Sequence, residues 1–194
     1  MSSIPVQVTG PIDHEPIINY EPGIKVNYDS FTKGDSSKQV IQFDPLIRSG
    51  IVRFEVLNVK KLKGIGIANR DANFGRHEDA FVGTNAIQVV EWKPNGSLHH
   101  NKNAVFYDSR YKEGDCIALE LNMDSEIRTL SLFVNGKMQN DYITHIPDAV
   151  RFWTYTNTVG DSFRVLKFER QQYPTGMHCE GSRSWKYGED WNPI

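Results

Sequence analysis

Cysteine is scarce in this chain, whose 194 residues include only Cys116 and Cys179. Two cysteines are too few for the disulfide framework of a small secreted domain, so we expect both thiols to be reduced. The sequence also lacks any run of about eighteen apolar residues, which predicts no membrane-spanning segment. Its first residues, MSSIPVQVTGPIDHE, contain no basic region followed by an apolar block, unlike a secretory signal. These absences favour a cytoplasmic protein, with the nucleus as the alternative compartment.

Positive charge is not in excess either. The 22 Lys and Arg residues are balanced by 24 Asp and Glu residues, which gives a net charge of −2. Because nucleic-acid binding draws on clustered Lys and Arg, this balance argues against a nucleic-acid partner. The densest basic run, KKLK at 60–63, lies between two strand candidates and is interpreted as a solvated turn.

Apolar residues, by contrast, are plentiful enough for one full core, since 39% of the chain is hydrophobic. We find no window of about eleven or more residues with helical periodicity. Short alternating segments separated by turn residues predict an all-β fold, an antiparallel two-sheet β-sandwich. The strand candidates are 39–43, 50–57, 64–68, 86–92, 97–99, 104–107, 115–121, 127–134, 142–144, 149–155 and 163–169.

The strongest local signal lies in residues 114–140, GDCIALELNMDSEIRTLSLFVNGKMQN. Apolar and polar residues alternate through a first strand, 116–121, and again through a second, 129–134. Asn135-Gly136 follows, and this pair best tolerates the two positive φ angles of a tight hairpin turn. The segment therefore predicts an antiparallel β-meander.

The two ends of the chain differ from the middle. Residues 1–37 are polar and rich in proline, which predicts an extended N-terminal segment that packs on the sandwich. Residues 171–194 form a C-terminal tail with four aromatic side chains, Tyr173, Trp185, Tyr187 and Trp191. So many aromatics argue against disorder, so we expect the tail to pack on the domain, with a partner-binding segment as the alternative.

Histidines and acids were considered as metal ligands and catalytic groups. His99 and His100 are adjacent, so on a strand they point to opposite faces and do not hold one ion together. The chain has no Gly-x-Ser-x-Gly nucleophile motif, and Gly64-x-Gly66 has neither a third glycine nor a following helix. We therefore expect no metal, no cofactor and no catalytic residue. The carboxylates Glu120 and Asp124 leave a sugar-cleaving hydrolase as a rival hypothesis.

The order of several motifs resembles that of the SPRY domain family. The similarity covers residues 38–170 and implies a SPRY-type, concanavalin-like sandwich used for protein recognition rather than catalysis. The matching segments are GIVRFEVL at 50–57, GIGIAN at 64–69, PNGSLHHNKN at 94–103, GDCI at 114–117, RTLSLFVNGK at 128–137 and a closing strand that ends at Phe168.

The resemblance also implies where a partner binds. Relatives that capture extended peptides use the residue after the Leu of the motif at 94–103 and the loop before the last strand. Carried over by motif, these positions are His99, with His100 beside it, and Thr158, Val159 and Gly160. The long loop at 69–83, NRDANFGRHEDAFVG, adds candidates by length and chemistry only: Arg70, Asp71, Phe74 and Arg76.

Each candidate has a structural alternative, since Phe74 could cap the core and His99 could be a surface strand residue. The functional hypothesis is a monomeric, non-catalytic adaptor that binds a peptide or protein. The rival from another class is a lectin-like sandwich in which Trp92 or Trp153 stacks on a sugar ring, although alternation places Trp92 in the core.

Overall fold

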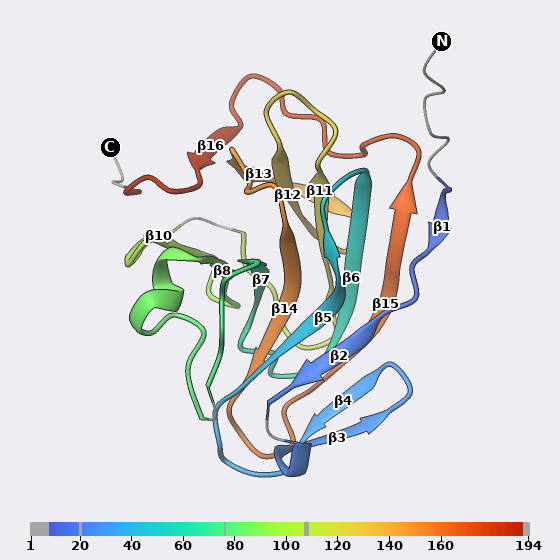
Figure 1. Ribbon diagram of the computed structural model, residues 1–194, viewed down its shortest axis with the longest axis vertical. Helices are drawn as coiled ribbons and strands as arrows, with labels where there is room; N and C mark the ends of the chain where they lie inside the picture. Colours follow the sequence, from blue (N-terminus) through green and yellow to red (C-terminus); the bar gives the residue numbers. More distant parts are fainter. Residues whose placement is uncertain (1–7, 20, 76, 107–108, 192–194) are drawn as a thin grey trace.

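The computed structural model describes residues 8–19, 21–75, 77–106 and 109–191. Two β-sheets pack face to face, and short 3₁₀ turns, η1 (Glu21–Gly23) and η2 (Gly83–Ile87), are the helical elements of the described residues (Figure 1). The predicted all-β sandwich is confirmed. No helix in these ranges is long and apolar enough to cross a membrane.

The larger sheet has nine strands among the described residues, in the order β16-β13-β12-β11-β6-β15-β4-β3, with β1 beside β15. All pairs are antiparallel except β13 and β16, which are parallel. The strands are β1 (Gly10–Pro11), β3 (Ile24–Asn27), β4 (Ser30–Lys33), β6 (Ile51–Lys60), β11 (Cys116–Asn122), β12 (Thr129–Val134), β13 (Lys137–Thr144), β15 (Ser162–Gln171) and β16 (Arg183–Lys186).

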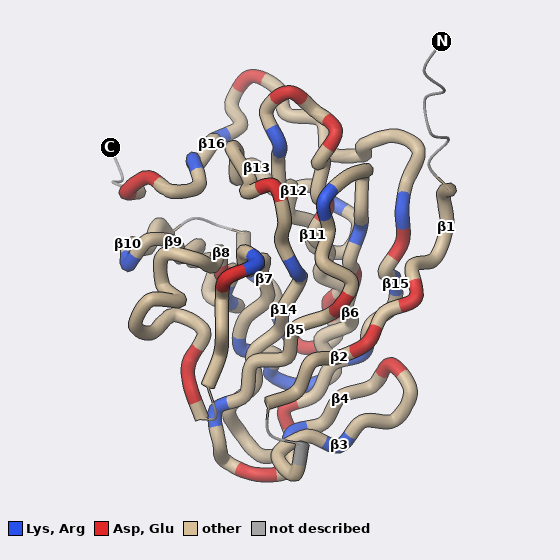
Figure 2. Tube along the Cα trace, viewed as in Figure 1, with Lys and Arg blue, Asp and Glu red and all other residues tan. Residues whose placement is uncertain are grey.

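The smaller sheet has seven strands in the described ranges, in the order β10-β9-β8-β7-β14-β5-β2. They are β2 (Glu15–Ile18), β5 (Gln39–Ile47), β7 (Gly64–Asn69), β8 (Val89–Trp92), β9 (Ser97–His100), β10 (Asn103–Phe106) and β14 (Val150–Thr156). Lys, Arg, Asp and Glu residues are spread over both sheets and their loops (Figure 2).

The hairpin predicted at 135–136 is present. Val134 of β12 pairs with Lys137 of β13, and Asn135 and Gly136 have φ angles of 49° and 77°. Two successive positive φ angles twist the turn in the same sense as the strands, which is why Asn-Gly suits this position. The sequence pattern thus fixes the register of this part of the larger sheet.

The core between the sheets is built from the inward residues of the alternating strands. Phenylalanines dominate its centre, where the rings of Phe54 and Phe152 stack with centroids 5.0 Å apart. Phe31 and Phe163 stack in the same way at 4.9 Å. All four are at most 2% exposed, so the two sheets are joined by a continuous aromatic layer.

The start of the described chain crosses from one sheet to the other. β1 pairs with β15 of the larger sheet and β2 pairs with β5 of the smaller one, and the Ile12 amide donates to the Phe168 carbonyl (2.7 Å). This segment is extended, as expected, and it also supplies strands to both sheets. The division of the chain at residues 37 and 170 stays a sequence-based prediction.

The C-terminal tail packs on the sandwich over its described residues, 172–191. β16 adds to the edge of the larger sheet beside β13, and the Trp191 ring is only 3% exposed. Trp185 and Trp191 face each other with centroids 5.8 Å apart and contact the main core. Trp185, Tyr187 and Trp191 therefore extend the core, as predicted, whereas Tyr173 is 70% exposed.

Candidate binding surface on the smaller sheet

A long connection between β7 and β8, described at residues 70–75 and 77–88, lies on the outer face of the smaller sheet. We call it the covering loop. Its apolar side chains and those of the sheet form a second hydrophobic cluster, separate from the main core. The members are Val40, Ala68, Ala72, Phe74, Ala80, Val89, Trp153 and Tyr155, with Phe81 packed against them.

Phe74 belongs to this second cluster and is not a surface anchor. Its ring is 3% exposed and lies 6.2 Å from the Trp153 ring. Phe74 therefore caps a core, as the structural alternative predicts. A partner could not reach this side chain without displacing the covering loop.

The Gly64-x-Gly66 pattern lies on β7, and its glycines serve strand packing. On the outer face, Gly66 pairs with Glu91 of β8 on one side and with Trp153 of β14 on the other. A Cβ atom on Gly66 would lie 3.1 Å from the Trp153 ring and would collide with the Val90 carbonyl. Glycine is thus required for the close approach of neighbouring strands, not for a dinucleotide.

His99 lies half-buried at the edge of the second cluster. The Phe81 ring meets it edge-on at 5.1 Å, and its Nε2 lies 2.8 Å from the Ser97 hydroxyl. Burial, together with the charge of Lys93, lowers the pKa of His99 to about 4. The imidazole is therefore neutral near pH 7 and offers hydrogen bonds rather than charge.

The turn from β14 to β15 carries Thr158, Val159 and Gly160. The buried Asp161 carboxylate accepts hydrogen bonds from the amides of Asn157 (3.3 Å) and Thr158 (3.0 Å), and the Gly160 amide donates to the Lys33 carbonyl (2.8 Å). Gly160 has a φ of 84°. These contacts fix the turn, yet Val159 is 59% exposed at its tip, so the turn presents an apolar side chain from a rigid base.

Asp79 of the covering loop connects this turn with His99. The Tyr155 hydroxyl donates to the Asp79 carboxylate (3.2 Å) and accepts from the side-chain Nδ2 of Asn157 (3.5 Å). The Asp79 charge also acts on the pKa of His99. Asp79 therefore contacts the strand that leads into the Thr158–Gly160 turn and acts electrostatically on His99. That His99 and the turn form one surface stays a prediction.

The other predicted residues do not join this group. Arg70 is exposed, forms an ion pair with Asp148 and lies with Asp71 beyond the opposite end of β7. The six residues of β7 alone put roughly 20 Å of strand between Arg70 and the end of the sheet that carries the turn. Arg76 lies outside the described residues.

His100 faces the other side of β9 from His99 and is fully buried. Its Nδ1 lies 2.7 Å from the Val89 carbonyl, and the Gly188 amide donates to its Nε2 at 2.7 Å. The rings of Tyr187 and Trp191 pack against the imidazole at 4.3 and 5.2 Å. His100 therefore anchors the tail and is not part of the candidate surface.

Sequence reasoning missed Glu91, which shares the outer face with His99. Glu91 is 0% exposed, and burial, as the main cause, raises the pKa of its carboxyl group to about 7. Its position between the core residues Val90 and Trp92 identifies it as outward-facing, which normally means solvated. Only the covering loop makes this position buried, and a loop path is not encoded in local periodicity.

The carboxylates of the hydrolase hypothesis have structural partners. Glu120 accepts hydrogen bonds from the amides of Thr175 (2.7 Å) and Gly176 (2.8 Å) and from the Thr175 hydroxyl. Asp124 accepts from the Gly50 amide (2.6 Å). Among the described residues, no three or more His, Cys, Asp or Glu side chains are arranged to hold a metal ion.

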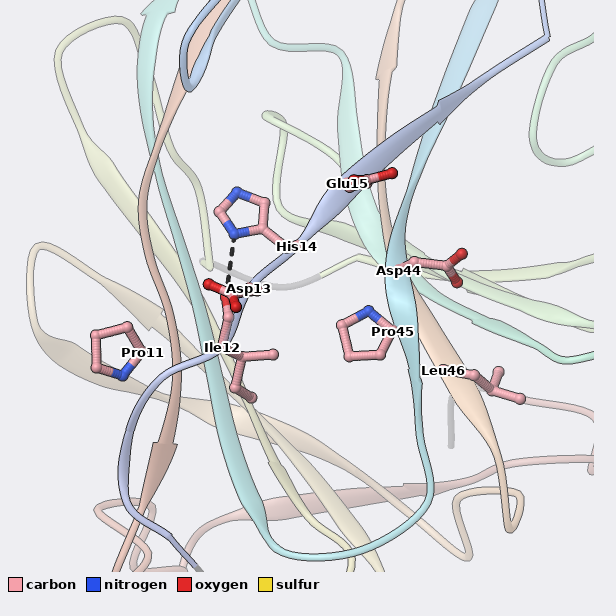
Figure 3. A pocket seen from close by; sticks show the side chains of 8 residues that line it. All are labelled: Pro11, Ile12, Asp13, His14, Glu15, Asp44, Pro45 and Leu46. Carbon is pink, nitrogen blue, oxygen red and sulfur yellow. Dashed lines mark hydrogen bonds between the residues drawn. The ribbon is translucent and has the colours of Figure 1, made fainter.

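A separate open hollow of about 790 Å³ lies beside the N-terminal crossing (Figure 3). Side chains of residues 11–15 line it on one side, and Asp44, Pro45 and Leu46 line it on the other. The Asp44 carboxylate there accepts a hydrogen bond from Arg151 (2.6 Å). None of the residues predicted to bind a partner lines this hollow.

Two sheets of this topology, with the candidate surface at one end, define a SPRY-type sandwich, and the predicted resemblance is confirmed at the level of the fold. The SPRY domain of human HERC1 superposes with a TM-score of 0.59 at 15% identity, over 86% of this chain and 100% of that domain. The TRIM65 PSpry domain superposes with a TM-score of 0.54 at 10% identity, over 74% and 85%. No family model and no curated protein sequence matches the chain.

Proposed function

We propose that this protein is a non-catalytic interaction module that binds a peptide or protein partner at the end of the smaller sheet. The binding surface consists of His99 and the Thr158–Gly160 turn, with Phe81 beside them. The observation that carries the proposal is the rigid presentation of Val159, whose turn is held by Asp161 and Lys33. A preformed apolar contact costs little conformational entropy when a partner binds.

The SPRY domains of HERC1 and TRIM65 share the fold and support a recognition role by analogy only. Within this proposal the protein acts inside the cell, as a monomer, and serves as an adaptor. The lectin alternative receives no support, because Trp92 and Trp153 are at most 1% exposed and neither ring is available to a sugar.

The test compares capture of partners from a cell lysate by wild type, Val159→Asp and a matched control, Val26→Asp. Val26 is also an exposed valine, at 46%, but it lies on β3 of the other sheet. We expect a partner that wild type and Val26→Asp retain and Val159→Asp loses by at least tenfold. Circular dichroism confirms that all three proteins are folded.

A second substitution, His99→Ala, checks the other side of the surface. Its loss of the same partner would support one continuous site. A partner that binds all variants equally would contradict the proposed surface, and the tail would then be the next segment to test.

A further inference from the structure

The outer face of the smaller sheet contains a buried carboxylate, Glu91, whose nearest donor is Lys93 in a long ion pair. Within the described residues, neither Glu91 oxygen accepts a hydrogen bond, and the nearest cation, Lys93 Nζ, lies 3.4 Å from Oε2. Buried carboxylates in native structures are normally paired, because a desolvated charge without donors is costly. The missing donor calls for a physical explanation.

The carboxylate extends toward the end of the sheet that carries the proposed surface. It lies over Gly64, where a Cβ atom would come within 3.2 Å of the Glu91 Cδ. Gly64 pairs with Tyr155 of β14, and the proposed Thr158–Gly160 turn follows this strand. Glycine at position 64 therefore creates the space into which the Glu91 side chain points.

The charged and titratable groups around Glu91 come from several elements. Lys93 follows β8, His99 is on β9, Tyr155 is on β14 and Asp79 is in the covering loop, where Lys38 Nζ lies 3.7 Å from its carboxylate. The side chains of Lys93 and Lys38 are 32% and 49% exposed. Such long, partly solvated ion pairs contribute little, so both lysines can swing into water without a large cost.

We propose that Glu91 is the specificity-determining acceptor of the binding surface and takes the guanidinium group of an arginine side chain of the partner in place of Lys93. This inference rests on the proposed function. A guanidinium supplies several N–H donors in a planar fork, which suits a carboxylate that lacks donors. Asp79, whose negative charge also acts on Glu91, adds a second attraction for the same cation.

Arginine binding at this site is coupled to loss of a proton. In the free protein, burial raises the pKa of Glu91 to about 7, so the carboxyl group is only partly ionised at neutral pH. A bound guanidinium favours the ionised form. Affinity should therefore rise about tenfold between pH 6 and pH 8, while His99, with a pKa of about 4, stays neutral.

The experiment selects ligands from a phage-displayed library of random dodecapeptides on immobilised wild-type protein. We expect the selected peptides to share an arginine, to lose at least tenfold in affinity for Glu91→Gln, and to show the pH dependence with wild type only. Glu113→Gln, at an exposed position, is the matched control and should bind like wild type. Lys93→Met removes the internal competitor and should tighten binding several-fold, which provides a test independent of the Glu91 variant.

The outcomes separate this inference from the proposed function. If Val159→Asp no longer binds the selected peptides but Glu91→Gln binds them as tightly as wild type, Glu91 has no role in binding. The proposed surface would then still stand. Arginine peptides that bind wild type, Glu91→Gln and Val159→Asp alike would overturn both. Both proposals would also be overturned if the library yields no peptide that binds wild type more tightly than Val159→Asp.

Discussion

The two outer faces of the sandwich are covered in different ways. On the smaller sheet, the covering loop packs Phe74, Ala80 and Phe81 against Trp153 and its neighbours, a contact that is mostly apolar. On the larger sheet, the tail is held by directional polar contacts with buried acids. The covering loop excludes water by burying apolar surface, and hydrogen bonds fix the position of the tail.

Two acids of the larger sheet carry the polar cover. Glu120, 2% exposed, holds the backbone of Thr175 and Gly176. Asp141, fully buried, accepts hydrogen bonds from the Arg183 guanidinium (2.9 and 2.7 Å) and from the Trp185 indole (3.0 Å). Each acid is satisfied by donors from the tail, whereas Glu91 under the apolar cover is not.

This contrast indicates a division of roles. The polar contacts of the larger sheet specify one position for the tail, since a shift would leave buried carboxylates without donors. The apolar contacts of the smaller sheet stabilise the covering loop without satisfying the acid beneath it. Under our proposal, the smaller sheet is therefore the face that binds the partner.

Truncation of the apolar cover should have the largest effect. Phe74→Ala removes a buried ring that packs on Trp153, and we expect it to lower the free energy of unfolding by about 3 kcal/mol. Urea denaturation measures the loss, with Val82→Ala as the control because Val82 is 55% exposed on the same loop. A loss below about 1 kcal/mol would mean that the second cluster is not a true core.

Removal of one polar anchor should cost less. Glu120→Gln keeps one acceptor oxygen but weakens charge-assisted bonds to the tail, so we expect a loss of about 2 kcal/mol and faster proteolysis within residues 172–191. Arg53 keeps its pairing with Glu55 (3.0 Å), which limits the damage. Glu126→Gln, at an exposed site, is the control. Unchanged proteolysis of the tail would show that its other contacts, among them those of Asp141 and His100, hold it without Glu120.

Protonation of His100 should have the smallest effect. Burial lowers the pKa of His100 below its ordinary 6.5, so the folded state favours the neutral ring and the unfolded state takes up protons first. Stability is thus full above pH 6.5 and falls as the pH drops toward the lowered pKa, because the unfolded state binds protons that the buried ring does not.

Thermal melts between pH 7.5 and pH 5 measure this slope. His100→Gln should flatten it, whereas His145→Gln, at an exposed position, should not. His99 and His178, whose pKa values burial also lowers, contribute to the slope that remains. If stability depends on pH equally in wild type and His100→Gln, groups other than His100 cause the pH sensitivity.

The predicted strands correspond to elements that the structure contains. The alternation in 116–121 and 129–134 and the Asn135-Gly136 turn predict β11, β12 and their neighbour because period-two patterns and positive φ angles are local properties. The candidates missed β1, β2, β3, β4 and β16, which are short and lie at or next to sheet edges. Their pairing depends on partners far away in sequence.

The candidate site was predicted less completely. Motif order predicts His99 and the Thr158–Gly160 turn as one surface, which stays a prediction; Asp79 contacts Tyr155 on the strand before the turn and acts electrostatically on His99. The sequence suggests Phe74 as a binding residue by loop length and chemistry, and His100 as the motif neighbour of His99, yet both are buried. The difference comes from the covering loop and the tail, whose paths no short-range signal encodes.

The sequence by itself determined the all-β class, the meander at 114–140 and the turn chemistry, because each follows from side-chain period and backbone preference within a few residues. The tertiary structure alone decided how the acids on the strands are buried and paired. Glu91, Glu120 and Asp141 all occupy strand positions, and distant segments cover them. Burial depends on the whole fold. Burial makes a carboxylate either an anchor for another segment or an acceptor that lacks hydrogen bonds.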